Sequence, residues 1–280
     1  MEITRACLKH HSRCLRAPRC GIFGPNLLNA ARCAAFIWPK SPAKRNAHPA
    51  EGMFQTCSGT KRPVTGRDLK LIAAAAMLID HIGLVLLKDS GLYWPCRAVG
   101  RMSFPLYCFL LAEGFMYTRD RKKYGKLLLI FALLSEIPFD LAVFGKVWYA
   151  GSQNVYVTLF LGVCMMAALE RMNGNEWERL AAVGVFCAAA EAVRCDYGAV
   201  GMILIGGFYY GHCRREPAGW AVAGTTALLL SQYYLGSGLL GLLLIHFYSG
   251  ERGRIRYKYA WYGLYPLHLL ILYGMVTVHR

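Results

Sequence analysis

Long apolar stretches recur along the chain and alternate with short polar segments that hold most of its Lys and Arg residues. The stretches cover residues 71–87, 102–117, 127–144, 154–169, 180–193, 197–211, 219–234, 235–248 and 259–278. A perpendicular transmembrane helix needs about 20 apolar residues, so the shorter stretches indicate tilted or re-entrant elements. The pattern predicts an all-α, polytopic integral membrane bundle of about nine transmembrane helices, with eight to ten as the range.

The distribution of basic residues predicts how this bundle is oriented. Counted over alternating loops, 17 Lys and Arg residues fall on one side and 6 on the other. Because cytoplasmic loops are enriched in Lys and Arg, we expect a cytoplasmic N-terminus and an external C-terminus. This explains the formal charge of +16 without nucleic acid, and 56% hydrophobic residues are typical of a protein whose partner is a lipid bilayer.

Residues 1–66 differ in composition from the rest of the chain. They contain eleven Lys and Arg against two acidic residues, hold five of the 11 cysteines, and show no helical periodicity. Their cysteine spacings lack the paired C-x-x-C pattern of zinc sites, and we expect no metal. We interpret this segment as a basic extension that is disordered or not naturally translated, with Met53 as an alternative start, and residues 67–280 as the transmembrane domain.

Asp80 and His81 lie side by side within the apolar run LKLIAAAAMLIDHIGLVLL, residues 69–87. A charged group at the centre of a membrane helix costs about 2.5–3.5 kcal/mol, and such groups usually face a protein interior or a water-filled cavity. The pair therefore indicates a functional site, with buried interhelical hydrogen bonds as the alternative. Adjacent helical residues point about 100° apart, so we expect His81 to take an orienting carboxylate from another helix, either Glu136 or Asp140.

Further polar residues are expected in the same half of the bundle. Glu136 and Asp140 are four residues apart and share a helix face, with Pro138 between them. The remaining polar positions of the central and outer part are Gln153, Asn154, Asp196, Tyr265 and His268. Their convergence on the centre and outer half of the bundle predicts one site.

Several segments together resemble the TraX family of membrane proteins. They are LKLIAAAAMLIDHIG, VGRMSFPLYCFLLAEGF, RDRKKYGKLLLIFALLSEIPFDLAVF, QNVYVTL, DYGAVG and YPLHLLILY. The resemblance covers about residues 67–278 in order and with similar spacing, and it leaves out the N-terminal segment. It implies a multi-pass acetyltransferase of the bacterial cytoplasmic membrane, which moves acetyl from cytoplasmic acetyl-CoA to a pilin N-terminus or another envelope amine or hydroxyl.

The polar residues fit such a reaction, because acetyl transfer needs a base and donors that stabilise an oxyanion. We expect His81 to be the base, oriented by Asp80, Glu136 or Asp140, with His268 as the second candidate. The acceptor-positioning or oxyanion candidates are Arg101, Gln153, Asn154, Asp196 and Tyr265. The candidates for holding CoA are Arg119, Arg121, Lys122 and Lys123, for which membrane topology alone is the alternative explanation.

Two other functional classes stay open at this point. Asp80, His81, Glu136 and Asp140 would also suit a proton relay in a small-solute or proton-coupled transporter. A non-catalytic scaffold for envelope or pilus assembly is the third hypothesis.

Overall fold

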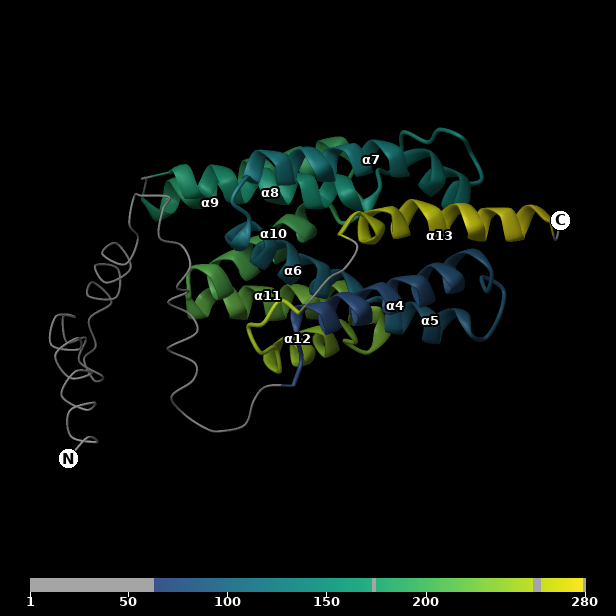
Figure 1. Cartoon of the computed structure of the whole chain (residues 1–280), viewed down its shortest axis with the longest axis horizontal. Helices are drawn as coiled ribbons and strands as arrows, with labels where there is room; N and C mark the ends of the chain where they lie inside the picture. Colours follow the sequence, from purple (N-terminus) through teal and green to yellow (C-terminus); the bar gives the residue numbers. More distant parts are fainter. Residues whose placement is uncertain (1–62, 173–174, 254–257, 279–280) are drawn as a thin grey trace, which may run out of the picture. The chain divides into compact units, whose positions relative to one another are not determined.

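A computed structural model describes residues 63–172, 175–253 and 258–278, so the segment interpreted as an N-terminal extension lies almost wholly outside the described residues (Figure 1). The described helices are α4 (Gly66–Val85), α5 (Tyr93–Gly100), α6 (Ser103–Tyr117), α7 (Arg121–Phe144), α8 (Val155–Arg171), α9 (Glu176–Val193), α10 (Gly198–Phe208), α11 (Pro217–Leu230), α12 (Gly238–His246) and α13 (Lys258–Val278), with a π-helical turn η2 (Tyr209–Cys213) and a 3-10 turn η3 (Gln232–Tyr234). All of them belong to the unit Thr60–Arg280. The expected all-α class is confirmed for this part of the chain.

Each predicted apolar stretch overlaps one described helix, and α5 is the helix that the pattern missed. Two of the described helices, Arg121–Phe144 and Tyr259–Val278, are long and apolar enough to cross a membrane by length and composition. The other helices are shorter or, like α4, contain several charged residues. The positions of the helices therefore match the expectation. Their lengths and compositions support fewer membrane spans than the expected nine.

Local sequence explains where the key helices begin and end. Thr65 and Asp68 form a capping box at the start of α4, in which each side chain accepts a hydrogen bond from the other residue's backbone N–H. Asn154 caps α8 by accepting from the backbone of Tyr156 at 3.0 Å. α7 ends at Gly145, whose φ of 66° is the left-handed conformation that glycine adopts without strain.

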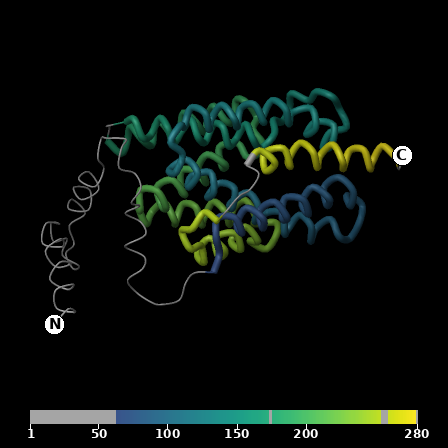
Figure 2. The backbone as a smooth tube through the Cα atoms, in the orientation of Figure 1, coloured from purple at the N-terminus to yellow at the C-terminus, as the bar shows by residue number. Residues whose placement is uncertain are grey.

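The packing of the helices brings distant segments of the chain together. α4 packs against α5, α6 and α13, while α7 lies between α8 and α13 (Figure 2). α6 supplies the centre of the core, where the ring of Phe109 contacts Phe208, Trp220 and Tyr248. The first and last described helices, α4 and α13, thus lie side by side, and this contact creates the candidate site.

Large apolar side chains cover the outer faces of several helices. On α7 alone, Ile130, Leu133 and Leu134 are 52%, 71% and 59% exposed. α13 likewise exposes Leu267 and Ile271. Exposed apolar surface of this extent is unfavourable in water, and it indicates that the protein associates with a membrane.

Candidate functional site

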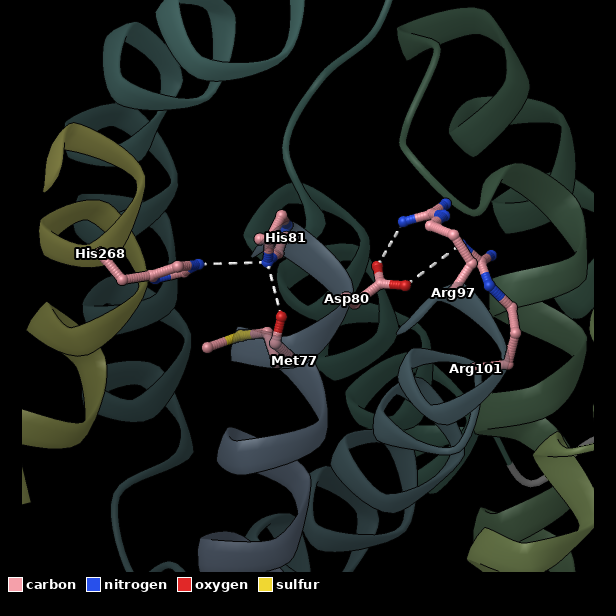
Figure 3. Close-up of polar contacts among 6 residues, drawn as sticks. All are labelled: Met77, Asp80, His81, Arg97, Arg101 and His268. Carbon is pink, nitrogen blue, oxygen red and sulfur yellow. Dashed lines mark hydrogen bonds and ion pairs between the residues drawn. The ribbon is translucent and has the colours of Figure 1, made fainter. Parts of the chain in front are cut away.

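His81 of α4 and His268 of α13 are in direct contact (Figure 3). Nε2 of His268 lies 3.1 Å from Nδ1 of His81, and the two ring centroids are 4.8 Å apart. His268 is buried, whereas His81 is partly accessible to solvent. The sequence named both residues as candidate bases but did not predict that they would bond to each other.

Backbone carbonyl groups determine which nitrogen of each ring carries the proton. Nδ1–H of His268 donates to the carbonyl oxygen of Leu264 at 2.8 Å, so its Nε2 is an acceptor. That Nε2 accepts from Nδ1–H of His81, which is also 2.9 Å from the carbonyl oxygen of Met77. Nε2 of His81 therefore keeps its lone pair and has no hydrogen-bond partner among the described residues.

Aromatic rings surround the histidine pair on one side. Tyr265, one turn before His268 on α13, is 4% exposed and packs edge-on against His81 at 5.8 Å and His268 at 5.6 Å. Tyr156 of α8 packs edge-on against Tyr265 at 5.3 Å. Tyr265 therefore lies beside both histidines, its expected role toward an acceptor stays a prediction, and the tyrosine rings restrict the orientation of both imidazoles.

Asp80 points to another side of α4 and forms an ion-pair cluster with α5 (Figure 3). Nη1 of Arg97 donates to Oδ2 of Asp80 at 2.6 Å, and Nη2 of Arg101 lies 3.8 Å from Oδ1. Gly100 permits this approach, because a Cβ atom there would lie 2.0 Å from Oδ1 of Asp80. The sequence predicted Arg101 but missed Arg97, although the four-residue spacing of the two arginines would place them on one helix face.

The expected orientation of His81 by a carboxylate of α7 is wrong. Glu136 instead accepts hydrogen bonds from the side chain and the backbone N–H of Asn154. Asp140 accepts from the backbone N–H of Tyr149 at 2.7 Å. Both carboxylates turn toward the segment that precedes α8, so α7 supplies no partner to His81 within the described chain, and the two α7 residues lie in a separate network.

The two residues expected at the outer mouth of α8 have mainly structural contacts. Asn154 is fully buried, caps α8, and donates through Nδ2 to the carbonyl oxygen of Ala132 at 2.7 Å. The backbone of Gln153 pairs with that of Arg194 and Asp196, which joins two loops in a short parallel bridge. The structure thus gives Asn154 a folding role in place of the expected substrate contact.

Asp196 lies in the loop between α9 and α10 and belongs to the electrostatic surroundings of the arginine pair. It interacts through charge with Arg101, Asp80 and Arg97. Asp196 is exposed to solvent, and partial desolvation by the neighbouring protein raises the pKa of its carboxyl to about 6 against the opposing effect of Arg101. Asp196 therefore joins Asp80, Arg97 and Arg101 in one charged cluster, which brings together three residues that the sequence named as candidates for different roles.

The predicted CoA-binding residues lie at the opposite end of the helices. Arg121 pairs with Glu170, and its guanidinium lies 4.4 Å from the ring centre of Phe115. The other three members are exposed, namely Arg119, Lys122 and Lys123. Two more basic residues, Lys70 and Arg252, interact through charge with the buried carboxylate Glu113, which accepts a hydrogen bond from Tyr248.

Comparison with known proteins finds similarity over most of the chain. The model of the family described as TraX protein matches residues 65–276, and that of a family of unknown function matches residues 8–65. A probable fimbrial assembly protein, FimC of serogroup H1 from Dichelobacter nodosus, is 31% identical over 229 residues, or 73% of this chain and 92% of that protein. The uncharacterized protein RP591 of Rickettsia prowazekii (strain Madrid E) is 29% identical over 99 residues, 34% of each chain. No solved structure matches the chain.

Proposed function

The chain belongs to the TraX family, and from this premise we propose that it is a multi-pass acetyltransferase of the bacterial cytoplasmic membrane. It takes acetyl from cytoplasmic acetyl-CoA and transfers it to an amine or hydroxyl acceptor of the cell envelope. The observation that carries this proposal is the hydrogen bond between His268 and His81, because it leaves one imidazole nitrogen of His81 as a base among apolar helices.

The outer surface of the helices supports a multi-pass arrangement. From α7 to α11, consecutive helices are joined by short connections and pack against each other, so neighbouring helices in this stretch run antiparallel. Exposed aromatic residues lie near both ends of the helices: Trp94 and Trp148 near one, Trp177 and Tyr259 near the other. Trp and Tyr are enriched at the two interfaces of a membrane, so this distribution supports a bundle that spans the bilayer.

The proposed chemistry uses Nε2 of His81 as general base. As the acceptor nitrogen or oxygen attacks the thioester carbonyl, His81 removes the acceptor's proton and the carbonyl oxygen becomes an oxyanion. The C–S bond then breaks, and the leaving thiolate takes the proton from the imidazolium to give CoA thiol. His268 accepts from Nδ1–H throughout, which keeps the ring in the orientation that presents Nε2.

The proposed binding of acetyl-CoA depends on the basic residues at the other end of the helices. Arg119, Lys122 and Lys123 are exposed there and would pair with the phosphates of CoA. Lys70 lies near the start of the helix that contains His81. His81 is eleven residues, or about 16 Å, further along this helix. The thioester arm of acetyl-CoA would have to cover that distance, which requires the nucleotide and the acetyl group to bind at different depths.

The acceptor is proposed from the relatives. One similar protein is named as a probable fimbrial assembly protein, and the resemblance to TraX points to acetylation of a pilin N-terminus. We therefore propose a pilin or fimbrial subunit as the first acceptor to test, with other envelope amines and hydroxyls next. An alternative proton-relay role is less well supported, because the described contacts do not connect His81 to Glu136 or Asp140.

Binding of the donor tests this proposal without knowledge of the acceptor. The full chain in detergent is titrated with CoA and acetyl-CoA while its thermal unfolding is followed. We expect saturable stabilisation that weakens when Arg119, Lys122 and Lys123 are replaced by Gln, because each removed charge loses a phosphate contact. The matched control is Lys146→Gln, which removes an exposed charge at the opposite end of α7. A folded sample that neither ligand stabilises would contradict the acetyltransferase proposal.

A further inference from the structure

Arg97 and Arg101 retain hydrogen-bonding capacity that the described protein does not use. Nη1 of Arg97 donates to Asp80, whereas Nη2 of Arg101 forms only an ion pair with it at 3.8 Å, and both side chains are largely buried, at 14% and 16% exposed. The Nε–H groups of both are fully buried and have no hydrogen-bond partner in the described part of the chain. A buried donor without an acceptor destabilises the protein, so a ligand that accepts from both arginines would satisfy these donors.

Both guanidinium groups are held close to the carboxylate of Asp80. The two arginines are one helical turn apart at the end of α5, and the carboxylate of Asp80 lies against both. The missing side chain of Gly100 leaves room for that carboxylate. Each guanidinium is a planar fork of N–H donors, so an arginine whose terminal nitrogen is occupied still presents an edge that includes Nε.

The charges nearby define what the site can bind. Asp80 and Asp196 are the acidic groups that interact with the two arginines, and Tyr197 and Tyr234 are the neutral titratable groups close to Arg101. With both carboxylates ionised the cluster is neutral, and protonation of Asp196 leaves one positive charge. This balance suits a singly charged anion better than a dianion.

We propose that Arg97 and Arg101 bind a phosphate group, of the phosphodiester class, on the acceptor of the acetyl group when that acceptor is an envelope amine or hydroxyl other than a pilin N-terminus. A tetrahedral phosphate offers oxygens in several directions and can bond to two separate forks, whereas a planar carboxylate matches one fork. His81 lies within electrostatic range of both guanidinium groups. The inference rests on the proposed function in one respect, namely that the ligand next to His81 is the acceptor.

A phosphodiester probe tests this site in the absence of any acetyl donor. Dimethyl phosphate is titrated by calorimetry into the full chain in detergent, and into the double variant Arg97→Lys/Arg101→Lys. Lysine keeps the charge and the ion pair with Asp80 but lacks the fork, so we expect at least about tenfold weaker binding. The control is Arg194→Lys, an exposed arginine in the loop that also contains Asp196, and it is expected to bind as the wild type does.

Three results would overturn the inference. Equal affinity of the wild type and the double variant would exclude the two forks as the binding groups. Binding of lactate, a carboxylate probe, as tight as that of dimethyl phosphate would exclude phosphate as the preferred ligand. An equally large loss of acetyl-CoA affinity in the double variant would assign the site to the donor instead of the acceptor.

The same measurement distinguishes failure of this inference from failure of the proposed function. Unchanged acetyl-CoA binding together with absent phosphodiester binding would overturn the inference alone. If the double variant does not fold, as judged by its thermal unfolding, the single variants Arg97→Lys and Arg101→Lys replace it, and each is expected to lose part of the affinity.

Discussion

His268 accepts a hydrogen bond from His81 across the contact between α13 and α4, at 3.1 Å from Nε2 to Nδ1. The two residues are 187 positions apart in the chain, so folding of the whole helical part is needed to bring them together. Each ring is also anchored to the carbonyl group four residues earlier in its own helix. This arrangement makes His268 a positioning residue for His81, and it leads to the first prediction.

Replacement of His268 by Ala removes one of the two acceptors near Nδ1–H of His81 and leaves the carbonyl group of Met77, whereas replacement by Gln restores the second acceptor through its side-chain oxygen. Loss of a buried hydrogen bond costs about 1–3 kcal/mol, so His268→Ala should lower the acetylation rate about 5- to 150-fold. His268→Gln should recover most of that loss. The ¹⁵N spectrum of the His81 ring should show the Nδ1–H tautomer in both variants, because the carbonyl group of Met77 still accepts from it, with an Nδ1 resonance that shifts more in the Ala variant than in the Gln variant. An equal loss of rate in both variants would argue for a purely structural role or a role as base.

Gly100→Ala should disturb the arginine cluster, because the added Cβ would lie 2.0 Å from Oδ1 of Asp80 and would displace that carboxylate. Overpacking of this kind typically costs about 1–3 kcal/mol of unfolding free energy. We expect a lower thermal midpoint and weaker binding of dimethyl phosphate. Gly91→Ala is the matched control, since a Cβ there meets no atom within 4 Å. Equal behaviour of the two variants would refute the proposed close approach.

Asn154→Ala should be more harmful than the loss of an ordinary helix cap. The change removes the cap of α8, worth about 0.5–2 kcal/mol, and takes from the buried carboxylate of Glu136 its side-chain donor, at about 1–3 kcal/mol more, while the backbone N–H of residue 154 still donates to it. Asn175→Ala removes a comparable cap from the exposed start of α9 and should cost about 1 kcal/mol. Thermal unfolding of both variants measures the difference, and Glu136→Gln in the Asn154→Ala background should reduce the extra loss. Similar midpoints for the two caps would contradict the role given to Asn154.

The affinity for dimethyl phosphate should rise as the pH falls through about 6. Desolvation raises the pKa of Asp196 to about 6, so its carboxylate is ionised above this pH and repels an anion bound to the neighbouring arginines. Protonation below it removes that repulsion, while dimethyl phosphate itself stays a monoanion. Asp196→Asn should bind the probe more tightly at pH 8 and show no such pH dependence. A wild-type affinity that is constant from pH 5 to pH 8 would rule out this role of Asp196.

Much of the fold follows from the sequence, because continuous apolar runs define where helices lie even when their ends are uncertain. The run that contains Asp80 and His81 became α4, and the segment with Tyr265 and His268 became α13. The short helix α5 was missed since its eight residues include Pro95 and form no long apolar run. Because α5 was not predicted, the role of Arg97, the closest charged partner of Asp80, was missed as well.

The partners of individual side chains were harder to predict. Helical spacing shows that Asp80 and His81 point in different directions, but it does not show how each helix is rotated relative to its neighbours. For that reason a carboxylate of α7 was expected beside His81, where His268 in fact lies. Asn154 had a clearer signal, because an Asn directly before an apolar run is typical of a helix cap.

The central claim is that His81 acts as the base of an acetyl transfer, and release of CoA thiol from acetyl-CoA by the full chain in lipid nanodiscs tests it most directly. A pilin N-terminal peptide serves as the acceptor, and mass spectrometry detects the acetylated product. We predict that His81→Ala lowers the transfer rate about 10²- to 10⁴-fold, while His246→Ala, at an exposed histidine of α12, leaves the rate unchanged. Full transfer by His81→Ala, with the wild type active, would contradict the account.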